Sequence, residues 1–202
     1  MARYTGAKLR VTRRLGDLPG FTSKKSKSIK RPGQHGGNQK KLTQYAIRLE
    51  EKQKIRYNYG LSEKKLMNYI RQAKKVKGAS GTVLLQLLEM RLDNIVFRLG
   101  MAPTIASARQ IIGHKHILVN GNCLSIASYQ CQPGDVVSVK DNATSKKLIE
   151  TFLESPALSN IPQHLDFEKK NLSAKVLGIV DREWVALKLN ELFVIEFYSR
   201  KL

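Results

Sequence analysis

The residues of this chain that could bind a metal or transfer a proton are few and scattered. Its two cysteines, Cys123 and Cys131, lack zinc-type spacing, and no third cysteine exists to complete a set. The four histidines form no ligand cluster by spacing, and no nucleophile is paired with them in sequence. Asp93 follows Arg91 so closely that an internal ion pair or a helix cap is preferred to acid catalysis. The sequence therefore predicts no enzyme, no cofactor, no metal site, and two small buried thiols.

The main chemical feature of the chain is its positive charge, which is concentrated in one half. The sequence has 202 residues, with 36 Lys/Arg against 16 Asp/Glu and a formal net charge of +20. Residues 1–78 carry 22 Lys/Arg and 4 Asp/Glu, whereas residues 79–202 carry 14 and 12. A field of one sign suits a phosphate backbone, because binding releases condensed counterions, while a merely solubilising surface mixes both signs. This distribution predicts a nucleic-acid partner.

An anionic membrane and an organelle transit peptide are the alternatives that the same charge raises. No apolar run approaches the roughly 18–20 residues needed to span a bilayer. The N-terminus also lacks the apolar segment of a secretory signal. Residues 1–31 are basic and acid-poor like a transit peptide, but glycines and Pro19 interrupt them and no amphipathic period is present. We therefore expect an extended arm that wraps RNA, and no membrane partner.

Apolar residues at helical spacing predict four helices in the middle of the chain, at residues 42–57, 62–78, 80–100 and 105–112. Residues 1–41 show no period and predict an arm with short turns. The first helix has Tyr45 on its core face and Lys52 among its outward cations. Ser62 caps the second helix, whose apolar stripe includes Tyr69.

The apolar period changes after the fourth helix to the alternation of strands. Asn120-Gly121 between two apolar stretches predicts a β-hairpin with a primed turn. The further expected elements are a strand at 136–139, a helix ending near 154, a loop at 155–170, a strand at 172–180 and a helix at 190–200. For the last of these, a strand at 193–197 is the alternative. Together these elements predict an α+β fold.

Residues 90–135 join two short helices to the hairpin and concentrate basic groups at the connection. Arg109 lies among small residues that let a phosphate backbone approach closely. The run His114-Lys115-His116 follows the end of the helix, where its side chains can enter an RNA groove. Folded RNA is recognised by its shape and through phosphate and 2′-OH contacts. The segment is therefore predicted to act as a wedge against folded RNA.

Motifs throughout the chain resemble a known family. In and directly after residues 90–135, three stretches resemble the S4 RNA-binding module: R-L-D, A-S-A-R-Q-I-I-G-H-K-H-I-L-V-N-G and P-G-D-V-V. Outside this region, four further stretches resemble the small-subunit ribosomal protein S4 family. They are A-R-Y-T-G-A-K-L-R at the start, P-G-Q-H-G, R-L-E-E-K-Q-K-I-R-Y-N-Y-G, and V-I-E-F-Y-S-R at the end. The resemblance covers essentially all 202 residues, and several motifs in the right order make it specific.

The resemblance implies a helical, basic body domain that carries an inserted S4 module of two helices and a small β-sheet, with the C-terminus returning to the body. The expected domains are a basic arm at 1–41, the body at 42–89 with 181–202, the module at 90–154, and a loop and strand linking back at 155–180. It also implies primary binding to a multi-helix junction in the 5′ domain of small-subunit rRNA. That binding would nucleate assembly of the subunit body and contribute to translational accuracy.

The partners that the resemblance implies are this rRNA, ribosomal protein S5 and other small-subunit proteins, and mRNA near its entry channel; no homo-oligomer is expected. Two departures from the family matter. The arm lacks the cysteine cluster that binds zinc in some members, so no zinc is expected. Residues 37–41 hold only two cations where some members have an arginine-rich run, so a strong grip on mRNA is not expected there.

The stretch R-E-W-V-A-L-K-L-N-E-L resembles cyanobacterial and plastid members of the family. The expected location is therefore the small ribosomal subunit of the chloroplast stroma, with a cyanobacterial cytoplasm as the alternative. Two rival functions are an RNA-modifying or tRNA-charging enzyme and a small factor that recycles stalled ribosomes. The first needs a catalytic domain for which no motif is visible. The second leaves the terminal motifs unexplained.

The candidate RNA-binding residues are cations and polar side chains of the arm, the basic helices and the wedge. They are Arg3, Arg10, Arg13, Arg14, Arg31, Gln34, His35, Lys40, Lys41, Arg48, Lys54, Arg56, Arg71, Arg91, Arg98, Ser107, Arg109, Gln110, His114, Lys115, His116 and Asn120.

Overall fold

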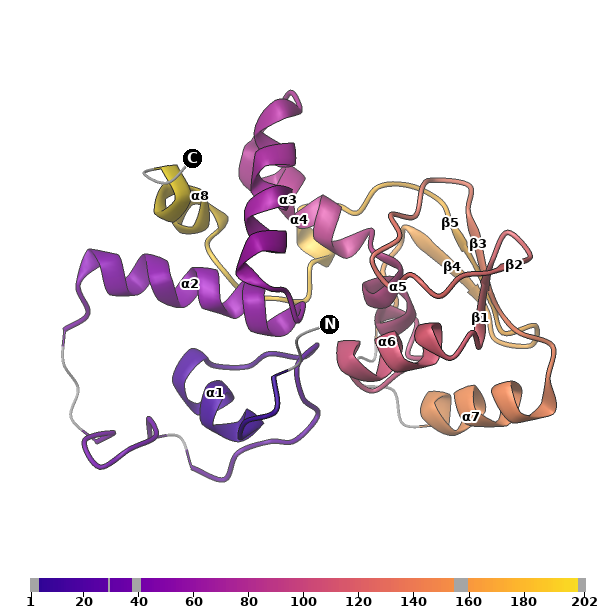
Figure 1. The fold of residues 1–202 in the computed structure, drawn as a ribbon, viewed down its shortest axis with the longest axis horizontal. Helices are drawn as coiled ribbons and strands as arrows, with labels where there is room; N and C mark the ends of the chain where they lie inside the picture. Colours follow the sequence, from indigo (N-terminus) through magenta and orange to yellow (C-terminus); the bar gives the residue numbers. More distant parts are fainter. Residues whose placement is uncertain (1–3, 29, 38–40, 155–159, 200–202) are drawn as a thin grey trace. The chain divides into compact units, whose positions relative to one another are not determined.

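The computed structural model describes residues 4–28, 30–37, 41–154 and 160–199 (Figure 1). The chain divides into two units, which we call unit 1 (residues 1–85 and 186–202) and unit 2 (residues 86–185). Unit 1 is helical, and unit 2 combines helices with a five-stranded antiparallel sheet, so the predicted α+β class is confirmed. Within the described ranges, no helix is both long and apolar enough to cross a membrane.

Unit 1 is built from α-helices packed around a small core. They are α1 (Lys8–Leu15), α2 (Gln44–Asn58), α3 (Glu63–Lys75), the beginning of α4 (Ser80–Glu89) and α8 (Glu191–Ser199). Helix α2 packs along α8 and also contacts α1. Leu66, Ile70 and Val194 are fully buried in this core. As predicted, Ser62 caps α3, since its hydroxyl accepts a hydrogen bond from the backbone N–H of Lys65.

Helix α1 lies in the segment that was expected to be an arm without regular structure. Val11 and Leu15, four residues apart on one helical face, are buried, and so are Leu18 and Phe21 after the helix. The glycines that suggested an irregular arm lie outside α1, and Gly16 ends the helix with a φ of 91°. The arm is therefore partly a folded element of unit 1.

Two side chains of α2 lie in environments that differ from the prediction. Tyr45, expected in the core, is 62% exposed, with its ring against that of Phe197. Lys52, expected to point outward, is buried, and its ammonium group donates to both carboxylate oxygens of Glu63 at 3.0 Å. The apolar period of α2 is weak, so contacts with distant residues decide which face is covered. Tyr69 is buried in α3, as predicted.

Unit 2 places its helices beside an antiparallel sheet whose strand order is β2-β1-β3-β5-β4. Its elements are α5 (Leu92–Arg98), α6 (Ile105–Gly113), β1 (Ile117–Val119), β2 (Asn122–Cys123), β3 (Val136–Val139), α7 (Ala143–Glu154), β4 (Leu165–Glu168), β5 (Ser173–Val176) and the 3-10 helix η1 (Arg182–Trp184). Helix α5 packs against α6, and α7 contacts β3 (Figure 1).

The β1–β2 hairpin confirms the predicted primed turn. Asn120 and Gly121 have φ angles of 51° and 78°, the left-handed conformation that this turn needs at both central positions. Strand β4 falls in the segment that was expected to be a loop. It pairs with β5 over four residue pairs, among them Leu165 with Val176, and so forms the sheet edge. The predicted burial of both cysteines is wrong for Cys123, which is exposed in β2.

The predicted helix at 80–100 is in fact two helices, α4 and α5, with an extended residue between them. Arg91 has β-region angles and forms an isolated antiparallel bridge with Gln130. The N–H of Cys131 donates to the carbonyl of Met90, and that of Leu92 donates to the carbonyl of Tyr129. This non-local pairing ends α4, and no local sequence signal announces it.

Candidate nucleic-acid interface

The positive charge of the chain is concentrated in unit 1. This unit carries 25 Lys/Arg and 6 Asp/Glu, a net of +19, while unit 2 carries 11 and 10, a net of +1. A net charge of this size in a unit of about half the chain repels itself, so an anionic partner stabilises it.

Ion pairs among the described residues occupy four of the six acids of unit 1. The pairs and their N–O distances are Arg31–Glu50 at 3.2 Å, Arg48–Glu196 at 2.6 Å, Lys52–Glu63 at 3.0 Å and Lys54–Glu51 at 2.5 Å. Three of these four cations belong to the candidate RNA-binding set. Arg48 and Lys54 are half-buried, and the Arg31 side chain remains 45% exposed. These three are therefore held partly by the protein itself.

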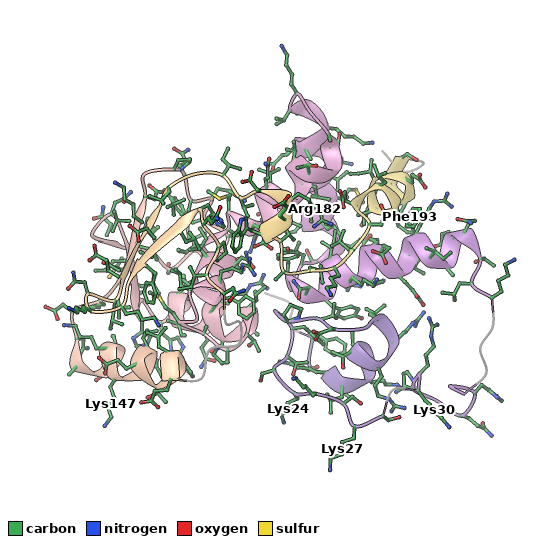
Figure 2. All side chains as sticks on the ribbon, turned by 180° about the vertical axis from the view of Figure 1, so that it is seen from behind. Lys24, Lys27, Lys30, Lys147, Arg182 and Phe193 are labelled. Atoms are coloured by element: carbon green, nitrogen blue, oxygen red, sulfur yellow. The ribbon has the colours of Figure 1, made fainter. Side chains whose placement is uncertain are left out.

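The remaining exposed cations of residues 4–77 have no acidic partner within the described part of the chain. They are Arg10, Arg14, Lys24, Lys25, Lys27, Lys30, Lys41, Lys64, Lys65, Arg71, Lys74, Lys75 and Lys77. In Figure 2, Lys24 and Lys27 extend outward from the segment that follows α1. Cations without internal partners are the ones that phosphate groups can neutralise.

Most of this set is not among the residues that the sequence predicts to bind RNA. Only Arg10, Arg14, Lys41 and Arg71 belong to both sets. A signal for the others exists in the sequence, because no Asp or Glu occurs between Asp17 and Glu50 or between Glu63 and Glu89. A lysine well inside such an interval has no acid nearby in sequence, so it more often stays available; Lys64 and Lys65, which directly follow Glu63, are not covered by this signal.

The other candidates of the arm are placed differently. Arg13 is half-buried and donates from its Nε to the carbonyl of Lys30 at 3.0 Å, so it ties the following loop to α1. Gln34 and His35 are exposed in a turn. Arg56 is half-buried beside the ring of Tyr57. Arg3 and Lys40 lie outside the described residues.

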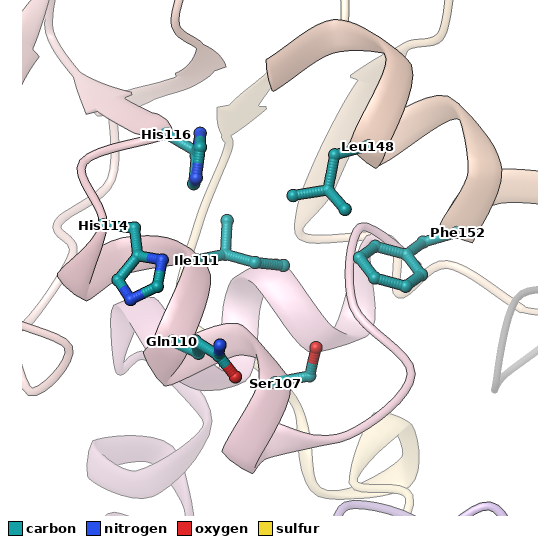
Figure 3. A pocket seen from close by; sticks show the side chains of 7 residues that line it. All are labelled: Ser107, Gln110, Ile111, His114, His116, Leu148 and Phe152. Carbon is teal, nitrogen blue, oxygen red and sulfur yellow. The ribbon is translucent and has the colours of Figure 1, made fainter. Parts of the chain in front are cut away.

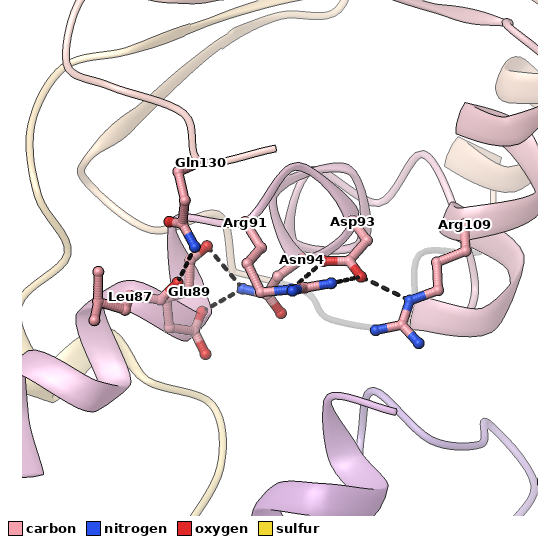
Figure 4. Close-up of polar contacts among 7 residues, drawn as sticks. All are labelled: Leu87, Glu89, Arg91, Asp93, Asn94, Arg109 and Gln130. Atoms are coloured by element: carbon pink, nitrogen blue, oxygen red, sulfur yellow. Dashed lines mark hydrogen bonds and ion pairs between the residues drawn. The ribbon is translucent and has the colours of Figure 1, made fainter. Parts of the chain in front are cut away.

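In unit 2, Arg91 and Arg98 are not placed to contact RNA as predicted, because both are buried, at 3% and 5% exposure. Arg91 donates from Nε and Nη2 to the two carboxylate oxygens of Asp93 at 2.9 and 2.7 Å (Figure 4). Arg109 Nε donates to the same carboxylate at 2.7 Å. The predicted internal ion pair of Asp93 is therefore confirmed, and it locks α5 to α6.

A second buried ion pair lies at the other side of α5. Arg98 Nε lies 3.6 Å from a carboxylate oxygen of Glu89, and its Nη2 donates to the carbonyl of Trp184. The side-chain amide of Asn94 donates to the Glu89 carboxylate at 2.7 Å. Buried charges need such partners, because the unsolvated charge otherwise costs several kcal/mol. Arg98 is therefore a structural residue of unit 2.

Four candidates of the wedge, from α6 and the residues after it, do come together in space. Ser107, Gln110, His114 and His116 line one pocket with side chains of α7 (Figure 3). Lys115 between the histidines is exposed. The side chain of Asn120 is already hydrogen-bonded within unit 2. Its Nδ2 donates to the carboxylate of Asp135 at 2.8 Å, and its Oδ1 accepts from the N–H of Val136 at 2.9 Å.

The titratable groups with large pKa shifts in unit 2 are suited to packing rather than to catalysis. Burial, followed by the charges of Asp135 and Asp93, raises the pKa of the Cys131 thiol to about 12. Burial, with the nearby charge of Arg98, lowers the pKa of His164 to about 4. A neutral buried thiol and a neutral buried imidazole offer no activated nucleophile at neutral pH. No cluster of three or more metal-binding side chains occurs among the described residues.

Comparison with known proteins identifies the family. A model described as the Ribosomal protein S4/S9 N-terminal domain matches residues 3–89, and the S4 domain matches residues 90–137. The Small ribosomal subunit protein uS4c of Emiliania huxleyi is 76% identical over 202 residues, with both chains covered fully. The uS4 protein of Nostoc punctiforme is 59% identical and the uS4c protein of Pyropia yezoensis is 60% identical, each over 201 residues and the full length of both chains.

All three relatives carry the names of small-subunit ribosomal proteins, and none is named as an enzyme. The protein of the cyanobacterium Nostoc punctiforme is named uS4, and the other two are named uS4c. Both parts of the predicted resemblance, the family and its plastid or cyanobacterial type, are confirmed. The chain belongs to the ribosomal protein S4 (uS4) family.

Proposed function

We propose that this chain is a structural, RNA-binding protein of the small ribosomal subunit in a plastid or a cyanobacterium. The observation that carries the proposal is the segregated charge: a net of +19 in unit 1, with four of its six acids engaged in ion pairs among the described residues. The family relationship supports the same function, because the relatives bear the names of small-subunit ribosomal proteins. The unpartnered cations of unit 1 bind rRNA phosphates, and unit 2 lies against folded RNA.

The finer parts of the proposal concern what the RNA is and what binding achieves. The target is a multi-helix junction in the 5′ domain of small-subunit rRNA, recognised by its shape, since cations dominate the exposed polar groups. Binding nucleates assembly of the subunit body and contributes to translational accuracy. Ribosomal protein S5 and other small-subunit proteins are neighbours, with mRNA near its entry channel. The site of action is the plastid stroma, or the cytoplasm of a cyanobacterium.

The test is a binding titration of the full chain with an isolated 5′-domain rRNA fragment and with an unstructured RNA of equal length, across a salt series. Selective binding of the fragment that persists at high salt supports shape recognition of the junction. Equal, salt-sensitive binding of both RNAs refutes the junction and leaves only a polycation on RNA. The logarithm of the binding constant falls with a slope of roughly −0.7 to −0.9 per neutralised phosphate.

A triple variant of α3 tests which cations make the contacts. Lys64, Arg71 and Lys75 are exposed and recur at intervals of seven and four residues, so they share one helical face. Changing all three to Gln is expected to reduce the salt slope by about 2 to 3. Glutamine keeps the helix propensity of these positions.

The matched control removes the same charge from unit 2, by changing three exposed lysines of the β4–β5 hairpin to Gln: Lys169, Lys170 and Lys175. This variant is expected to keep the fragment affinity and the salt slope of the parent chain. If the two triple variants lose affinity equally, net charge alone drives binding, and the assignment of the interface to unit 1 is refuted.

A further inference from the structure

Side chains of helices α6 and α7 of unit 2 line a partly open pocket. It has a volume of about 140 Å³ and is lined by Ser107, Gln110, Ile111, His114, His116, Leu148 and Phe152 (Figure 3). Four of these positions are spaced on α6 and just after it at intervals of three, one and three residues, which places them on one face. Leu148 and Phe152, four residues apart, form the facing surface of α7.

The pocket combines an apolar lining with polar groups that can still form hydrogen bonds. Ile111 is 4% exposed, and Leu148 and Phe152 are half-buried opposite it. The Ser107 hydroxyl and the Gln110 amide have no side-chain hydrogen bond with any described residue. Ligand sites of small molecules share this design, in which apolar walls supply contact and a few polar groups fix orientation.

His116 is held in place at the edge of the pocket. Its Nδ1 lies 2.9 Å from the hydroxyl of Ser145, a buried residue of α7. Its backbone is fixed at both sides, because its N–H donates to the carbonyl of Ile111 and its carbonyl accepts from the N–H of Lys140. A ring that is fixed through Nδ1 leaves Nε2 to bind a ligand.

We propose that this pocket binds one unstacked pyrimidine base of an RNA strand. A cavity of about 150 Å³ accepts benzene, so the volume of about 140 Å³ matches one six-membered ring better than the fused rings of a purine. Phe152 stacks on the base, and the amide of Gln110 pairs a donor and an acceptor with its polar edge. Unstacked bases on aromatic side chains are a general mode of RNA recognition.

This inference rests on the proposed RNA-binding function and adds a base-recognition site to it. Leu148 and Phe152 lie beyond residues 90–137, the part of the chain that matches the S4 domain. Two of the seven lining side chains therefore come from a helix outside the matched domain. The neighbouring Lys115 is exposed and can hold the phosphate next to the bound nucleotide.

The test measures binding of the full chain to hexanucleotide probes that differ in a single base. One probe is an abasic ribose-phosphate strand, a second carries one uracil, and a third carries one adenine. All three have the same phosphate charge, so the cations of unit 1 contribute equally to each. The uracil probe is expected to bind about 5-fold more tightly than the abasic probe, or better, and the adenine probe is expected to gain less.

Two variants act on the pocket in different ways. Phe152→Leu removes the stacking ring but keeps an apolar side chain, and Ser107→Leu fills the pocket from α6. Both are expected to abolish the gain from uracil while binding of the abasic probe stays unchanged. The matched control is Tyr45→Leu, which removes an aromatic ring that is 62% exposed in unit 1 and is expected to keep the gain.

The possible results separate this inference from the proposed function. A uracil gain that survives in both pocket variants, or a larger gain for adenine, overturns the pyrimidine pocket. Absence of any uracil gain, while the 5′-domain rRNA fragment still binds selectively, overturns the pocket alone. If neither the probes nor the fragment bind, the proposed function fails with it.

Discussion

Replacing Asp93 by Asn tests how strongly the buried ion-pair network holds unit 2 together. The Asp93 side chain is 1% exposed and accepts three charged hydrogen bonds, two from Arg91 and one from Arg109. Asparagine keeps the size of the side chain but removes its negative charge and replaces one acceptor oxygen by a donor. The substitution therefore changes the electrostatics and leaves the packing almost untouched.

The expected loss follows from what happens to each arginine. The Arg91 side chain is 4% exposed, so its charge stays in the interior after the carboxylate is neutralised. The Arg109 side chain is 15% exposed and can turn its guanidinium group toward water. Removing one member of a buried ion pair costs about 3–5 kcal/mol, and the escape of Arg109 favours the lower end, about 3 kcal/mol. A domain of this size has about 5–15 kcal/mol in total, so the loss is large.

The assay is urea unfolding followed by tryptophan fluorescence. Trp184 is the single tryptophan of the chain and belongs to unit 2, so its emission reports on this unit. The control is Asp141→Asn, which removes an ion pair of the same unit whose carboxylate side chain is 93% exposed. Exposed pairs contribute little, so this variant should unfold like the parent. Equal urea midpoints for the two variants would contradict a stabilising role of the buried network.

Three further outcomes are expected. Since burial and then the charge of Arg98 lower the pKa of His164 from 6.5 to about 4, only the unfolded chain binds this proton, and the stability of unit 2 falls as the pH drops from about 6.5 to 4. His164→Leu should flatten that pH dependence in the fluorescence assay. Tyr198→Phe removes the hydroxyl that donates to the Glu63 carboxylate and should destabilise unit 1 by about 2 kcal/mol, measured by circular dichroism in urea. Added salt should raise the unfolding midpoint of unit 1 and leave that of unit 2 unchanged. Tyrosine circular dichroism follows the unfolding of unit 1, because six of the seven tyrosines belong to it.

Features with a local physical cause were predicted correctly from the sequence. Ser62 was expected to cap a helix, and its side chain accepts a hydrogen bond from the N–H of Lys65, three residues later. Asn120-Gly121 forms the expected turn because both residues tolerate a positive φ. A capping hydroxyl and a left-handed turn depend on neighbouring residues alone, so their signals survive in any tertiary context.

Features that depend on distant residues were missed. Strand β4 exists because β5 offers it a pairing partner, and its own sequence, Leu165–Glu168, has a weak strand pattern. Arg91 leaves the helix because the strand-like segment around Gln130 pairs with it. Helix α1 is short and has two buried residues, Val11 and Leu15, and the next buried apolar residues lie after its end, at Leu18 and Phe21. Tertiary contacts decide such elements, and local propensity contributes little to them.

Which cations face RNA depends on the fold, but how many remain unneutralised does not. Arg48 pairs with Glu196, 148 residues away, and Arg31 pairs with Glu50, so no local pattern could have removed these two arginines from the candidates. Yet unit 1 has only six acids for 25 cations, and one carboxylate balances one charge however the chain folds. At least nineteen positive charges are therefore left over in every arrangement of this unit. The nucleic-acid partner follows from that count, which explains why the function was predicted more reliably than the residues that perform it.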